Sequence, residues 1–145
     1  MTGSVQAAYD WGVFGQSLTA NPRGIEGWRT LAGDVVRRWG AAPEVVELVR
    51  LGVSELISNV VRHVADRPRC YLRIVLIGSE VTVQLFDRSV RIPVIGAAPD
   101  WDAEDGRGLW MLREMAARFG CERTRHQHGK IVWFTCDLSG SHRAP

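Results

Sequence analysis

Two neighbouring segments that alternate apolar and polar side chains constrain the fold of this chain most strongly. Residues 70–78 read CYLRIVLIG and residues 80–87 read EVTVQLFD, with a Gly78-Ser79 link between them. Alternation with a period of two is typical of a strand that buries one face, and a short glycine-containing link is typical of a hairpin. The sequence therefore predicts an antiparallel pair of strands whose apolar face needs a covering layer.

Two amphipathic segments before this pair can supply the covering layer. Asn21-Pro22 is a typical helix start, because an asparagine side chain caps the first turn and proline suits the first helical position. We expect this helix to stop at Gly40, and a second helix to begin at Pro43 and end before Pro68. Apolar residues recur at helical spacing in both segments: Ile25, Trp28, Leu31, Val35 and Trp39 in the first, and Val45, Val49, Val53, Leu56, Val60 and Val64 in the second.

The rest of the chain predicts a further strand, a long loop, a third helix and a closing hairpin. Residues 11–18 are expected to form an edge strand, and residues 88–105 a loop of a length typical of functional segments. The closing hairpin is expected to pair residues 121–127 with residues 130–138. The predicted fold class is an α/β two-layer sandwich, a mostly antiparallel mixed sheet with helices on one face. The third helix is expected to carry Leu109, Leu112, Met115, Ala116 and Phe119 and to end at Gly120.

Length and composition are those of one globular domain, which we expect to span residues 9–138 between flexible ends at 1–8 and 139–145. The three cysteines form no CxxC motif and leave an odd one out, which suits a reducing cytoplasm. No signal peptide is evident, and no apolar run approaches the ~18 residues of a membrane span. The sequence therefore predicts a cytoplasmic, soluble protein, and its net charge of +2 is only weak support for a nucleic-acid partner.

Three polar residues interrupt the apolar pattern of the second helix. Glu55, Asn59 and His63 recur at four-residue intervals and therefore share one helical face. Two interpretations are open. The residues can form a polar flank that pairs with neighbours or water, or they can line a cleft. In a cleft, the carboxylate could accept a proton, and the amide oxygen could help to coordinate a hard cation such as Mg²⁺.

Other candidates for chemistry lie at the ends of predicted elements. Gly106-Arg107-Gly108 stands directly before the third helix, where free N–H groups and the positive end of the helix dipole favour phosphate. Asp87 ends a strand, where it can cap the following turn or accept a hydrogen bond from an exocyclic amine. The pair His126 and His128 has no third ligand nearby, which disfavours a metal site there.

Taken in order, these motifs resemble those of the Bergerat-fold ATPases, the superfamily of histidine kinases, Hsp90 and DNA gyrase B. The shared order is ExxxN on a helix, a strand-final aspartate, a loop, and a GxG that opens a helix. Within this superfamily the chain is most similar to the small anti-sigma factor serine kinases, over roughly residues 12–138. The similarity is carried by the segments SELISNVVRHV, GRGLWMLREMAARFG and GKIVWFTCDL.

The resemblance implies a role for each candidate. Glu55 would be the catalytic base, Asn59 would bind Mg²⁺, and Asp87 would accept the adenine amine of ATP. Residues 88–105 would form the lid over the nucleotide. The remaining residues implied near the nucleotide are His63, Ser89, Gly106, Arg107, Gly108 and Leu109.

The chain departs from the family pattern at three places. The family's Asp-x-Gly-x-Gly box here runs from Asp87 to Arg91 as DRSVR; Ser89 is small enough to keep the turn, but the second glycine is lost. Glu104 replaces an arginine that often precedes the GxG. A threonine that commonly reaches the adenine site after Gly129 is replaced by Ile131. These changes predict weaker ATP binding.

The function implied by the resemblance is that of an ATP-binding regulator that phosphorylates a serine on an anti-sigma factor antagonist. A sigma factor and an antagonist of the STAS type are the implied partners, and relatives of this kind dimerise. An alternative is a non-catalytic or weakly ATP-binding module that sequesters one of these partners. A third interpretation, a nucleic-acid binder, rests on scattered arginines and predicts a steep dependence on salt.

Overall fold

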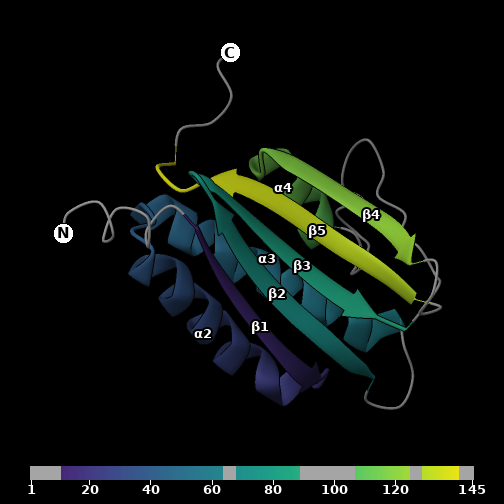
Figure 1. Ribbon diagram of the computed structural model, residues 1–145. Coiled ribbons are helices and arrows are strands. Elements are labelled where there is room, and N and C mark those ends of the chain that lie inside the picture. Colours follow the sequence, from purple (N-terminus) through teal and green to yellow (C-terminus); the bar gives the residue numbers. More distant parts are fainter. Residues whose placement is uncertain (1–10, 64–67, 89–106, 125–128, 141–145) are drawn as a thin grey trace.

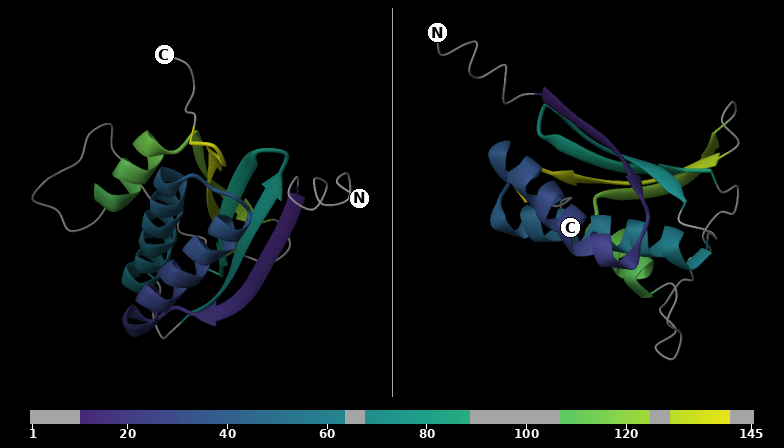
Figure 2. Two further views of the ribbon diagram at one scale, coloured as in Figure 1. Left: turned by 90° about the vertical axis from the view of Figure 1, so that its left-hand side faces the viewer. Right: turned by 90° about the horizontal axis from the view of Figure 1, so that it is seen from below.

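The computed structural model describes residues 11–63, 68–88, 107–124 and 129–140. Five strands form one open sheet in the order β1-β2-β3-β5-β4, and all four neighbouring pairs of strands are antiparallel (Figure 1). Three helices lie together on one face of this sheet (Figure 2), which confirms the two-layer α/β sandwich. The strands are β1 (Trp11–Thr19), β2 (Arg69–Ile77), β3 (Glu80–Asp87), β4 (Arg118–Thr124) and β5 (Gly129–Asp137), and the helices are α2 (Ile25–Arg38), α3 (Pro43–His63) and α4 (Arg107–Met115).

The first helical segment, which ends in α2, begins and ends where the sequence predicts. The Asn21 side chain accepts a hydrogen bond from the Arg23 backbone N–H at 3.0 Å and caps the 3-10 turn Pro22–Gly24 that leads into α2. Gly40 follows α2 with φ of +91°, a conformation that favours glycine. The expected core residue Val64 lies outside the described residues.

The expected third helix proved too long. It ends at Met115, and the chain joins the sheet two residues later, where the Ala117 backbone N–H donates to the Thr135 carbonyl at 2.8 Å. Phe119 therefore reaches the core from strand β4, not from a helix. Gly120 is a strand residue: a Cβ there would overlap the indole ring of Trp133, its register partner on β5.

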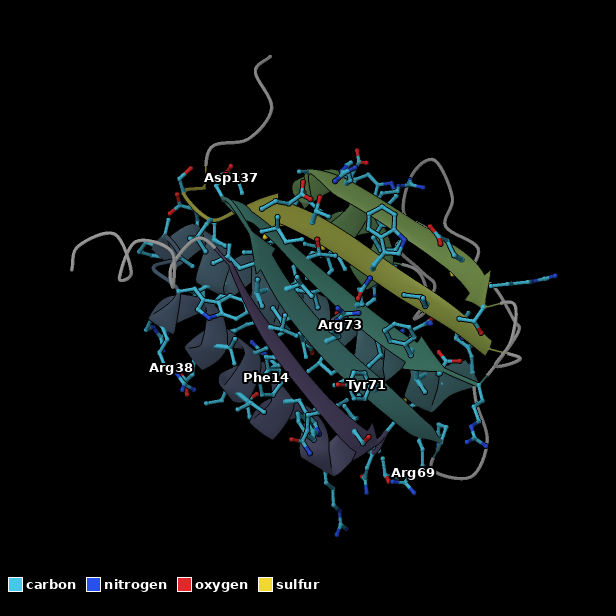
Figure 3. All side chains as sticks on the ribbon, viewed as in Figure 1. Phe14, Arg38, Arg69, Tyr71, Arg73 and Asp137 are labelled. Carbon is cyan, nitrogen blue, oxygen red and sulfur yellow. The ribbon has the colours of Figure 1, made fainter. Side chains whose placement is uncertain are left out.

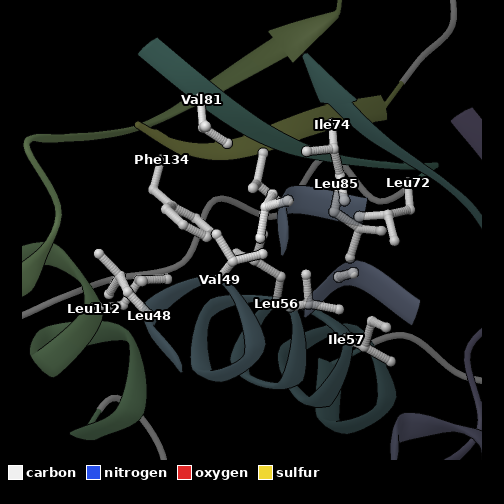
Figure 4. Packing of buried hydrophobic residues seen from close by; sticks show 14 of the residues in the cluster. Leu48, Val49, Leu56, Ile57, Leu72, Ile74, Val81, Leu85, Leu112 and Phe134 are labelled. Atoms are coloured by element: carbon white, nitrogen blue, oxygen red, sulfur yellow. The ribbon is translucent and has the colours of Figure 1, made fainter. Parts of the chain in front are cut away.

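Helix α3 lies between α2 and α4 in the helical layer and packs against the inner face of the sheet (Figure 4). Val49, Leu56 and Ile57 of this helix are buried in the core. Gly52 allows the closest approach, because a Cβ on it would overlap the ring of buried Phe134 from β5. The position of α3 is therefore fixed tightly relative to β5, and with it the positions of the polar residues that α3 carries.

The opposite face of the sheet carries no helix among the described residues. Arg69, Tyr71 and Arg73 project from β2 on this face (Figure 3), and the rings of Tyr71 and Phe86 meet edge to face at 6.2 Å. None of the helices in the described ranges is long and apolar enough to cross a membrane. An open cleft of about 790 Å³ lies where β2 starts and β3 ends, and it is lined by Ser17, Arg69, Cys70, Tyr71, Phe86, Asp87 and Arg88.

Candidate functional site

The polar column of α3 is partly buried, and its middle residue is the most enclosed. Asn59 is only 5% exposed. Glu55 and His63 are half-buried on either side of it, one helical turn away, and His63 does have an interaction partner. The column therefore places an enclosed amide between two half-buried ionisable side chains.

The structure brings Glu55 to the start of α4. All three terminal atoms of the Glu55 side chain lie within 3.0 Å of the place that a Cβ on Gly108 would occupy. Only glycine leaves room at this position for the carboxylate. Two motifs that lie 53 residues apart in the sequence therefore meet directly, as helices α3 and α4 pack together.

The first turn of α4 also presents the other described residues of the glycine motif. Arg107 begins the helix and is half-buried, and Leu109 is buried in the core. The backbone N–H groups of a first turn lack partners within the helix, which suits the binding of an anion. Gly106, Ser89, Glu104 and the predicted lid lie outside the described residues.

Asp87 at the end of β3 is buried and paired with a lysine. Its carboxylate oxygens lie 3.0 and 2.9 Å from the Lys130 ammonium nitrogen. Both side chains are only 1% exposed. The two residues are direct register partners on β3 and β5, so they face the same, helix-covered side of the sheet. Asp87 thus has a structural partner as well as the position that the sequence motif predicts.

Lys130 is the residue of this site that the sequence reasoning missed. The resemblance puts Ile131 where the family commonly has a threonine that reaches the adenine site. Ile131 pairs instead with Phe86 and, by strand alternation, faces the other side of the sheet. The missing information was the register between β3 and β5. The sequence offered one signal, because Lys130 is the only lysine in the chain and follows a glycine at the start of an apolar strand.

The ion pair influences the nearby thiols. The pKa of Cys70 is raised to about 12, mainly by burial and also by the Asp87 carboxylate, while the Lys130 ammonium opposes the rise. Burial also raises the pKa of Cys121, and Lys130 again opposes this effect. Asp87, Lys130 and the two thiols therefore share one desolvated region at the end of the sheet.

The donor set suits a magnesium ion held mainly by a nucleotide, and not a metal held by protein side chains alone. The residues that the structure describes contain no cluster of three or more His, Cys, Asp and Glu side chains. Mg²⁺ in phosphate-transfer sites takes one or two protein oxygens and otherwise phosphate and water. The buried amide of Asn59 could supply one such oxygen. His126 and His128 lie outside the described residues.

Comparisons with known proteins agree with this architecture. A family model described as the histidine kinase-like ATPase domain matches residues 18–136. Among solved structures, the chain is similar to the crystal structure of the RsbU and RsbW domains of Rv1364c from Mycobacterium tuberculosis, with a TM-score of 0.66 and 17% identity. That match covers 92% of this chain but only 34% of the other, and at this identity it supports the fold alone. No curated protein matches the chain. Since the family model spans most of the sequence, the chain belongs to the histidine kinase-like ATPase domain family.

Proposed function

We propose that the protein is an ATP-binding regulator of the anti-sigma factor kinase type. It transfers the γ-phosphoryl group of Mg·ATP to a serine of an anti-sigma factor antagonist of the STAS type, and a sigma factor is its second partner. Membership of an ATPase family and the likeness to a structure that contains an RsbW domain support this proposal. The observation that carries it is the packing of the Glu55 carboxylate against Gly108, one helical turn from the buried Asn59.

The proposed role of each residue follows from its chemistry. Phosphoryl transfer depends on positioning and on charge neutralisation, and Mg·ATP supplies the transferred group. Asn59 offers an oxygen to the metal, and Glu55 orients or deprotonates the serine hydroxyl. Asp87 accepts the adenine amine. Further proposed contacts to the nucleotide are made by His63, Ser89, Gly106, Arg107, Gly108 and Leu109.

Asn59→Ala tests the metal role. Loss of a ligand oxygen should weaken binding of Mg·ATP by about tenfold or more, while binding of ATP in EDTA should change little. Isothermal titration calorimetry with and without Mg²⁺ measures both. Ser58→Ala is the matched control, because Ser58 is the neighbouring half-buried residue of α3 and lies off the column. Equal weakening in Mg²⁺ and in EDTA would count against a metal ligand.

Glu55→Gln separates chemistry from binding. A positioned general base contributes about 10²–10⁴-fold in rate, so phosphotransfer to an antagonist serine should fall by that factor while ATP affinity stays near the wild-type value. Glu47→Gln is the control, since Glu47 is an exposed glutamate of the same helix. Radiolabelled ATP and single-turnover conditions report the chemical step. Full activity in Glu55→Gln would rule out the assigned role.

A second function, partner binding with little ATP turnover, is favoured by the ion pair at Asp87. A carboxylate that already accepts from an ammonium has less to offer to adenine. In this case the wild type should show no phosphotransfer, Glu55→Gln should change nothing, and binding to a sigma factor or antagonist should not require ATP. Pull-down with purified partners in the presence and absence of Mg·ATP distinguishes the two functions.

A further inference from the structure

The Lys130 ammonium donates to the carboxylate of Asp87, which is the acceptor that the proposed function assigns to the adenine amine. Its ammonium nitrogen lies 3.0 Å from Oδ1 and 2.9 Å from Oδ2 of Asp87. An exocyclic amine is also an N–H donor that binds a carboxylate at about this distance. The lysine is therefore a chemical stand-in for the amine of the base.

The ion pair is enclosed and not a surface contact. A lysine beside a strand end can usually extend its ammonium into water, as long side chains do. Here the whole side chain is 1% exposed and the ammonium lies on its cross-strand neighbour. Burial of both charges costs solvation, and this cost is offset only while the two charges stay together. The pairing should therefore be the preferred state of the protein without nucleotide.

At the register positions beside the pair that the structure describes, no second anion competes for Lys130. Cys70 on β2 is the register partner of Asp87. Its thiol stays neutral, because its pKa is raised to about 12, mainly by burial. Arg123 is the register partner of Lys130 on β4, but it is exposed and cannot neutralise an ammonium. Asp87 is therefore the anion in this row that balances the charge of Lys130.

We propose that Lys130 is a built-in competitor for the nucleobase. Its ammonium occupies acceptor positions of Asp87, so that a base amine gains little from this carboxylate until the lysine moves away. This inference rests on the proposed function, since it assumes that Asp87 faces the base. The competition predicts that this protein binds ATP weakly, although Asp87 is in place. It also predicts poor discrimination between purine nucleotides that differ at position 6.

The test measures the affinity of two proteins for two nucleotides. Wild type and Lys130→Met are titrated with ATP and with purine riboside triphosphate, which lacks the 6-amino group, both with Mg²⁺. Wild type should lose less than about threefold in affinity when the amine is absent, because the amine contributes little. Lys130→Met should bind ATP about tenfold more tightly than wild type and should lose about tenfold or more without the amine, since a hydrogen bond to a charged acceptor is then made.

Two further variants control for charge and packing. Lys130→Arg keeps a cation on Asp87 and should behave as wild type towards both nucleotides. Arg123→Met removes an exposed positive charge from the neighbouring strand and should not restore dependence on the amine. Methionine is unbranched and fills the space of the lysine stem. Circular dichroism and thermal unfolding establish whether Lys130→Met folds, and if it does not, the wild-type comparison decides by itself.

The outcomes separate this inference from the function on which it rests. A wild-type protein that loses tenfold or more without the amine overturns the competitor role and leaves the ATP-binding function in place. The same holds if folded Lys130→Met binds ATP no better than wild type. If no nucleotide binds to wild type or to any variant, with or without Mg²⁺, the proposed function fails and this inference fails with it.

Discussion

Replacement of Gly108 by alanine tests the contact that joins the two halves of the site. An added Cβ would lie within 3.0 Å of both carboxylate oxygens and of Cδ of Glu55. These atoms form the free end of a flexible side chain, so the carboxylate can swing away while the backbone stays in place. Gly108→Ala should therefore displace Glu55 and leave the fold intact.

The magnitudes favour a change in activity over a change in stability. Alanine in a helix is more favourable than glycine by about 0.5–1 kcal/mol, which offsets the cost of one side-chain rotation of about 0.5–1.5 kcal/mol. The melting temperature should thus stay near the wild-type value. A misplaced catalytic group costs about 10²-fold in rate, so phosphotransfer should fall by about this factor.

The assay compares three proteins under single-turnover conditions and by thermal unfolding. Gly27→Ala is the matched control, because Gly27 is an exposed glycine of α2 with no atom within 4 Å of an added Cβ. It should gain slightly in stability and keep full activity. The double variant Glu55→Gln/Gly108→Ala should be no slower than Glu55→Gln, since both changes act on one group. Wild-type phosphotransfer in Gly108→Ala would refute the idea that the glycine positions Glu55.

Two further predictions concern the core. Gly52→Ala adds a Cβ that overlaps the buried ring of Phe134. The overpacking cost of about 1–3 kcal/mol should exceed the helix-propensity gain of about 1 kcal/mol, so urea unfolding should show a less stable protein. Equal or greater stability would contradict the close contact. Burial raises the pKa values of Cys70 and Cys136 from 9.0 to about 12, so iodoacetamide at neutral pH should label half-buried Cys121 first. Early labelling of Cys70 would refute this order. Because these thiols hold their protons more tightly in the folded state, the stability that they contribute is present below about pH 9 and should be lost as the pH rises towards 12.

Local patterns were sufficient for most of the secondary structure. The alternation of residues 70–87 predicted β2 and β3, because each strand buries one face whatever the rest of the chain does. The caps at Asn21 and Gly40 predicted the limits of the first helical segment, because capping involves groups only a few residues apart. The column of Glu55, Asn59 and His63 likewise follows from helical spacing alone.

The boundary between α4 and β4 depended on tertiary contacts. Residues 115–120 contain apolar side chains that suit a helix as well as a strand, and Gly120 reads as a helix stop. The hydrogen bond from Ala117 to the Thr135 carbonyl and the space that Gly120 leaves for Trp133 favour the strand. Both interactions involve β5, which lies too far along the chain for a local pattern to reveal them.

The sequence by itself determined which residues could carry chemistry, and the tertiary structure decided which of them meet. Glu55 and Gly108 were both candidates, but only the packing of α3 on α4 brings them into contact. The pairing of Asp87 with Lys130 depends on the register of β3 and β5, which are separated by 41 residues from the end of one strand to the start of the other. A shift of that register by one residue would turn Lys130 to the other face of the sheet. Register is set by the sum of cross-strand contacts in the folded protein, and for that reason the partner of Asp87 could not be read from the motif that contains it.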